Sequence, residues 1–78
     1  MNLYLISQTE NNNYDTYDSA VVCAPDEETA RNIIPGGGKW NAIWSSWASR
    51  PENVTVKYLG EANQELKSGV VCASFNAG

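Results

Sequence analysis

The residues of this sequence that are best suited to bind a ligand are a glycine run and the lysine and tryptophan that follow it. Gly36-Gly37-Gly38-Lys39 can offer backbone N–H groups and one positive charge to a phosphate. Trp40, Trp44 and Trp47 follow at spacings that place them on one face of a short helix, where their rings can stack on a base. We therefore predict a ligand-binding site formed by Gly37, Gly38, Lys39, Trp40, Trp44, Arg50, Tyr14 and Tyr17.

The same residues also have plainer interpretations. The glycine run does not match a Walker motif, because its spacing differs and no Ser or Thr follows Lys39, and such a run is often only a hinge. Trp44 and Trp47 can complete the core while Trp40 covers a sheet edge, and clustered Trp and Tyr also suit a protein-binding hot spot. Arg31 is a second candidate for a phosphate or cation–π contact, although a solvated arginine is the usual case.

The sequence argues against catalysis and against a metal site. It contains no His, which removes the commonest general base and every Ser-His or Cys-His pair. Cys23 and Cys72 each stand among aliphatic residues of a predicted strand, so we expect both thiols in the core, and two Cys without His cannot complete a zinc site. Asp15 and Asp18 could in principle form a carboxylate pair of the glycosidase type, but a chain of 78 residues can hardly build the cleft. We predict a non-enzymatic protein with no cofactor.

Length and charge narrow the class of partner. The 78 residues are expected to form a single domain, residues 1–78, whose small core would benefit from a Cys23–Cys72 bridge or from self-association. Nine acidic residues against five basic ones give a net charge of −4, which argues against general DNA or RNA binding. This charge permits a pocket for a small anion or a basic protein partner, and it also simply favours solubility. Without a signal peptide or a stretch of about 20 apolar residues, we expect a cytoplasmic protein with no membrane association.

The elements that must position these residues follow from local patterns. Apolar segments predict strands at residues 2–8, 19–24, 54–59 and 70–75, with a polar loop over 9–18. Asp26 is a good N-cap for a helix that Pro35 must end, and Ala30, Ile33 and Ile34 form its apolar stripe. The sequence thus predicts an α+β fold: a small antiparallel four-stranded sheet in ββαββ order, with one helix and a Trp-rich short helix or loop.

The predicted sheet has more apolar surface than one helix can cover. Val22, Val71, Ala73 and Phe75 cannot all lie beneath a helix of about eight residues. Either the Trp-rich segment or a second subunit must cover the remainder, and we expect a homo-oligomer.

Three stretches carry a resemblance to known proteins: residues 14–22, residues 26–31 and residues 69–78. Together they resemble a group of small accessory proteins encoded by bacteriophages and prophages. The resemblance implies a short protein made in the cytoplasm of a bacterial host cell, where such proteins often counter host defence without catalysis. Two functions fit this setting best, and a structural or morphogenetic phage protein, for which the sequence offers nothing specific, is a third. One is a sponge that sequesters a small nucleotide immune signal as a homo-oligomer. The other is a direct inhibitor of a host defence protein, of the anti-CRISPR or nuclease-inhibitor type, acting through an acidic surface that includes Glu10, Asp15 and Asp18.

Overall fold

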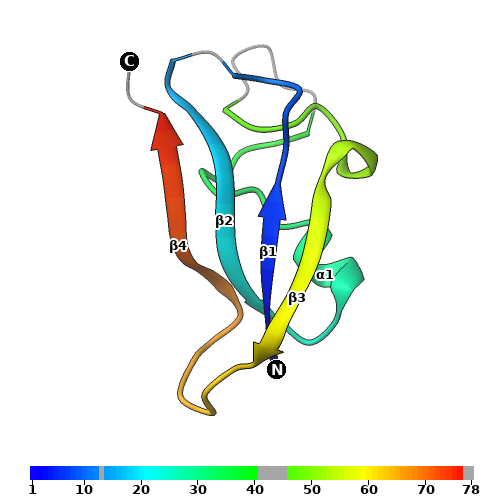
Figure 1. The fold of residues 1–78 in the computed structure, drawn as a ribbon, viewed down its shortest axis with the longest axis vertical. Helices are drawn as coiled ribbons and strands as arrows, with labels where there is room; N and C mark the ends of the chain where they lie inside the picture. The colour runs from blue at the N-terminus through cyan, green and yellow to red at the C-terminus, as the bar shows by residue number, and fades with distance from the viewer. Residues whose placement is uncertain (13, 41–45, 77–78) are drawn as a thin grey trace.

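The protein forms a four-stranded antiparallel sheet with a short helix after the second strand. The computed structural model describes residues 1–12, 14–40 and 46–76, which are shown in Figure 1. Along the chain these form β1 (Asn2–Ser7), β2 (Thr16–Ala24), α1 (Glu27–Arg31), the 3-10 turn η1 (Pro51–Asn53), β3 (Thr55–Glu61) and β4 (Gly69–Asn76). The strand order in the sheet is β3-β1-β2-β4. The predicted ββαββ order and the α+β class are confirmed.

The first two strands form the centre of the sheet because both of their faces are apolar. In β1, Tyr4 and Ile6 are buried on one face, while Leu3 and Leu5 are half-buried on the other. Its partner β2 alternates in the same way, and Ile6 stands directly opposite Ala20. A strand that can bury side chains on both faces gains most from a central position.

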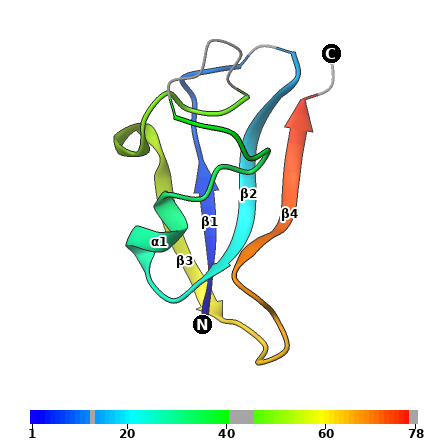
Figure 2. The same ribbon diagram turned by 180° about the vertical axis from the view of Figure 1, so that it is seen from behind.

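All other elements cover a single face of this sheet. Figure 2 shows α1 and the irregular segments that follow it in front of the strands, and Figure 1 shows the strands with these segments behind them. The core between the two layers consists of buried side chains from the sheet, from α1 and from the stretch before β3. They are Tyr4, Ile6, Ala20, Val22, Ala24, Ala30, Trp47, Ala48 and Val54.

The helix begins where the sequence predicts and ends earlier. The Asp26 side chain accepts a hydrogen bond from the Thr29 N–H at 2.7 Å, which confirms it as the N-cap. The helix stops at Arg31 rather than at Ile34. Pro35 disfavours helical backbone at the residue before it, so the last turn cannot form. Ile33 and Ile34 still pack against the core, but from an irregular segment.

Two further expectations differ from the structure. The second strand begins at Thr16, three residues before the predicted start, because the polar residues at its beginning pair with the end of β4. Cys72 is exposed and not part of the core, whereas Cys23 is fully buried beside the Met1 sulfur; both thiols are free. Cys72 lies on an edge strand, and the local sequence does not reveal which strand is at the edge.

The Trp-rich segment is described only at its two ends. Residues 41–45, including Trp44, lie outside the described residues, so the predicted short helix stays a prediction. Trp47 is 1% exposed and belongs to the core on the α1 side of the sheet. It therefore covers the same face as the helix, while Val71 and Phe75 remain exposed. Within the described residues, no helix is long and apolar enough to cross a membrane.

Candidate ligand-binding site

The glycine run lies in the irregular segment between α1 and Trp40. Gly37 and Gly38 have positive φ angles of 76° and 90°, which other residues rarely adopt. The Gly37 N–H donates a hydrogen bond to the Ile34 carbonyl at 2.8 Å, so this group closes a turn and is not available to a phosphate. A Cβ atom at Gly37 or Gly38 would meet nothing within 4 Å. Backbone is therefore open to solvent at both positions.

The first glycine of the run packs directly on an aromatic ring. A Cβ atom built on Gly36 would lie only 2.8 Å from Cε2 of Tyr17 and 3.1 Å from Oγ of Ser46. Only glycine lets the chain approach the ring this closely. The Tyr17 N–H donates a hydrogen bond to the Ser46 carbonyl at 2.8 Å, and this bond holds Ser46 beside the start of β2. Gly36 was not among the predicted site residues, although it is the glycine that joins the run to Tyr17.

Tyr17 also contacts the last strand. Its ring lies at a tilted angle of 56° to the ring of Phe75, with 4.8 Å between centroids. Both residues are paired in the β2–β4 register. Tyr17 is partly buried against the core, while Phe75 keeps 46% of its surface exposed. Sequence reasoning missed Phe75 as a neighbour of the site, because this contact depends on strand pairing across nearly the whole chain.

The side chain of a buried glutamine positions the start of β2. Nε2 of Gln8 donates to the carbonyls of Asn11 and Tyr17, each at 2.8 Å, and its Oε1 accepts from the Asn11 N–H at 2.8 Å. Gln8 is only 4% exposed, so these bonds satisfy a polar group that would otherwise be costly to bury. This network holds the loop after β1 and thereby sets the position of Tyr17.

Lys39 and Trp40 complete the charged and aromatic part of the candidate site. Lys39 is exposed, and the described residues contain no ion pair that involves it. Trp40 is partly buried and packs against the core. The plainer interpretation assigned the core to Trp44 and Trp47 and a sheet edge to Trp40. In the structure Trp40 itself packs against the core, with some of its surface left in contact with solvent.

The structure does not bring all predicted site residues together. Tyr14 is 75% exposed in the loop between β1 and β2, and Arg50 is exposed before η1. Within the described ranges, no hydrogen bond, ion pair or ring contact links either residue to Lys39 or Trp40. The contact that the structure shows among the candidate residues joins the glycine run, through Gly36, to Tyr17, with Phe75 beside it, and Lys39 and Trp40 are linked to the run by their place in the chain.

A glutamate anchors the loop after β1 to the stretch before β3. One carboxylate oxygen of Glu10 accepts from the Ser49 N–H at 3.0 Å, and the other accepts from the Ser49 hydroxyl at 3.0 Å and from the Asn53 amide. The bond from Asn53 and then that from Ser49 lower the pKa of Glu10, and the nearby charge of Arg50 adds a smaller effect in the same direction. Glu10 and Arg50 therefore contribute to this anchor at the surface.

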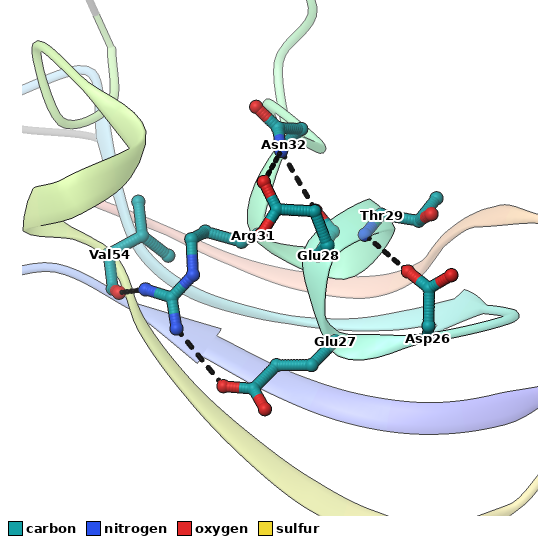
Figure 3. Close-up of polar contacts among 7 residues, drawn as sticks. All are labelled: Asp26, Glu27, Glu28, Thr29, Arg31, Asn32 and Val54. Atoms are coloured by element: carbon teal, nitrogen blue, oxygen red, sulfur yellow. Dashed lines mark hydrogen bonds and ion pairs between the residues drawn. The ribbon is translucent and has the colours of Figure 1, made fainter.

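The other candidate arginine is used within the fold. Figure 3 shows the Arg31 guanidinium between the Glu27 carboxylate, at 3.1 Å, and the Val54 carbonyl, to which it donates a hydrogen bond. Glu27 lies one helical turn earlier, and Val54 precedes β3. These contacts tie α1 to the edge of the sheet. Arg31 is thus occupied as a structural link and is removed from the predicted phosphate contacts.

The arrangement has features that suit the binding of a small ligand. The candidate site offers exposed backbone, one lysine charge and aromatic surface, which match a small anion with a stacking group. Among the described residues, no cluster of three or more His, Cys, Asp or Glu could hold a metal ion. Comparisons of the chain with protein-family models, with curated proteins and with solved structures found no match. The functional argument therefore depends on the geometry of the chain itself.

Proposed function

We propose that this chain is a phage-type, non-enzymatic binding protein that counters bacterial host defence by sequestering a small nucleotide signal, acting as a homo-oligomer in the host cytoplasm. The phage context comes from the resemblance of residues 14–22, 26–31 and 69–78. The ligand class comes from the site. A protein that only retains its ligand needs no catalytic group, which suits a sequence without His.

The observation that supports this proposal best is the close contact between Gly36 and the Tyr17 ring. It joins the start of the glycine run to one partly buried aromatic side chain, Tyr17, and Lys39 and a second one, Trp40, follow the run directly in the chain. In the bound state, Lys39 would pair with a phosphate, and one of the two rings would stack on the base. The open backbone at Gly38 would let the phosphate approach closely, whereas the Gly37 N–H is bonded to the Ile34 carbonyl.

Native mass spectrometry of the purified protein with a panel of linear and cyclic nucleotides tests the proposal directly. The expected result is an oligomer that retains one class of nucleotide. Lys39→Ala should then weaken binding by about 10-fold or more, because it removes a charge-assisted contact. Trp40→Ala should weaken it as well. Lys67→Ala is the matched control, since Lys67 is also exposed but lies in the connection between β3 and β4.

Two results would contradict the proposed site. The first is a protein that binds none of the nucleotides in the panel. The second is a nucleotide complex whose affinity is unchanged when Lys39→Ala and Trp40→Ala are combined. In the second case the ligand class would stand and the location would be wrong.

The alternative function is direct inhibition of a host defence protein through an acidic surface. Asp15 and Asp18 are both exposed in the structure, which favours this surface. Glu10 is a weaker candidate than the sequence indicated, because its carboxylate is held by Ser49 and Asn53. An inhibitor of this type would be inert without its target and would lose affinity steeply with added salt. A nucleotide sponge would bind its ligand with no host protein present.

A further inference from the structure

The strand β4 forms an open edge of the sheet. It pairs only with β2 and is the last strand in the order β3-β1-β2-β4. Figures 1 and 2 show it at the margin of the molecule from both sides. One side of its backbone therefore has N–H and C=O groups with no neighbouring strand within the described residues. An edge of this kind is a template for another strand.

The sequence of β4 lacks the charges and the proline that commonly protect an edge. Across Gly69–Asn76 there is no charged residue and no proline. Val70, Val71 and Phe75 are 42%, 47% and 46% exposed. The register with β2 shifts twice, between Tyr17 and Ser19 and between Val21 and Val22, and only the second shift leaves an extra residue in β4, Val71. Long, uncharged edges with exposed apolar side chains are rare in proteins that remain monomeric.

The opposite edge of the same sheet is protected. The strand β3 contains Lys57 and Glu61, whereas β4 contains no charged residue. Register shifts occur in the pairing of both edge strands and do not distinguish them. Charged side chains on an edge disfavour its pairing with another strand. The two edges therefore differ in charge, and β4 is the better suited to accept a partner strand.

We propose that β4 pairs with β4 of a second copy of this chain, antiparallel and around a two-fold axis perpendicular to the sheet. The result is a continuous eight-stranded sheet across two protomers. Identical uncharged strands meet without like-charge repulsion, although each chain carries a net charge of −4. Pairing satisfies the open backbone groups of both edges and buries the exposed apolar side chains of β4. The homo-oligomer is part of the proposed function; the surface and the symmetry are new.

This geometry also places the candidate site next to the partner. A two-fold axis perpendicular to the sheet puts the α1-covered faces of both protomers on the same side. Phe75 belongs to β4 and contacts Tyr17, whose ring packs on Gly36. The site of each copy therefore borders the seam between the protomers, and residues of the partner strand can contribute to it.

Light scattering during size-exclusion chromatography tests the proposal with two matched variants. Val71 and Leu59 are each 47% exposed, one on each edge strand. The wild-type protein should have the mass of two chains. Val71→Lys places a charge on both copies of the β4 edge and should shift the protein to the mass of one chain. Leu59→Lys should leave the mass of two chains unchanged, and circular dichroism should show that both variants are folded.

Thiol crosslinking gives a second, independent measurement. Cys72 is exposed on β4 while Cys23 is buried, so a short bis-maleimide should join two wild-type chains through Cys72. Cys72→Ser should abolish the crosslinked dimer, and Cys23→Ser should not.

The proposal is overturned if wild-type protein has the mass of one chain at high micromolar concentration. It is also overturned if Leu59→Lys dissociates the dimer and Val71→Lys does not. Neither measurement uses a nucleotide. A monomer that still binds nucleotide would refute the β4 dimer and the homo-oligomer and leave the proposed ligand standing, and a β4 dimer that binds none would refute the proposed ligand alone.

Discussion

The contact between Gly36 and the Tyr17 ring makes Gly36→Ala the most informative single substitution. The new Cβ would lie 2.8 Å from Tyr17 Cε2, closer than non-bonded carbon atoms normally approach. The ring cannot easily withdraw, because it packs against the core and against Phe75, 4.8 Å away between centroids. Either the segment after α1 or the ring must move. Both movements disturb the candidate site.

The expected cost follows from two opposing effects. Forcing an extra carbon into a packed contact costs about 1–3 kcal/mol. Replacing glycine by alanine also restricts the unfolded chain, which stabilises the folded state by about 0.4–1 kcal/mol. The net loss is then about 1–2 kcal/mol, because the steric effect dominates. For a domain of this size, that loss lowers Tm by roughly 5–15 °C.

A double-mutant cycle with Tyr17→Leu identifies the cause of this loss. Urea denaturation should show that Gly36→Ala destabilises the wild-type protein and is neutral or slightly stabilising when Tyr17 is replaced. Gly38→Ala is the control. Its Cβ would meet nothing within 4 Å, so its cost comes from the φ of 90° and should be equal in both backgrounds. Equal costs of Gly36→Ala in both backgrounds, or a stabilising effect in the wild type, would refute the reasoning.

Three further outcomes are expected. Glu10→Gln should destabilise the protein at neutral pH, because the lowered pKa of Glu10 in the folded state means that its carboxylate stabilises the fold. This stabilisation is present above the ordinary carboxyl pKa and is lost as the pH falls through the pKa that Glu10 has in the folded protein. The difference between this variant and wild type in urea midpoints should therefore shrink as the pH falls below the ordinary carboxyl pKa. Ile6→Ala should cost about 2–5 kcal/mol in urea denaturation, because Ile6 is fully buried, and the same change at the half-buried Leu5 should cost less. A thiol reagent should modify Cys72 in the native protein and should reach Cys23 only after denaturant is added. Native reactivity of both thiols would contradict the burial of Cys23.

Local signals in the sequence predicted an element well where the residues of that segment alone determine its conformation. The apolar segment at residues 2–8 predicted a strand, its two apolar faces are typical of a central one, and the structure places β1 between β3 and β2. Asp26 predicted the start of α1 because an N-cap bonds only to its own first turn. The end of α1 was harder to predict, since the packing of Ile33 and Ile34 does not require them to be helical.

The candidate site was predicted only in part, because its residues come together through pairing of distant segments. The glycine run and Lys39 were found from their own sequence. Phe75 was not, since its contact with Tyr17 depends on the β2–β4 register. Arg31 was considered for phosphate, but the fold directs it to Glu27 and Val54. A charged side chain has several partners within reach, and only the tertiary arrangement selects among them.

The sequence by itself determined the number and type of the main elements, the absence of histidine chemistry and the presence of a glycine run beside a lysine and aromatic residues. These properties depend on composition and on contacts between near neighbours in the chain. The tertiary structure alone decided which strands lie at the edges, and therefore that Cys72 is exposed and that β4 is open. The strand order depends on which set of long-range pairings buries the most apolar surface. This total area depends on all the strands at once and cannot be read from any single segment of the sequence.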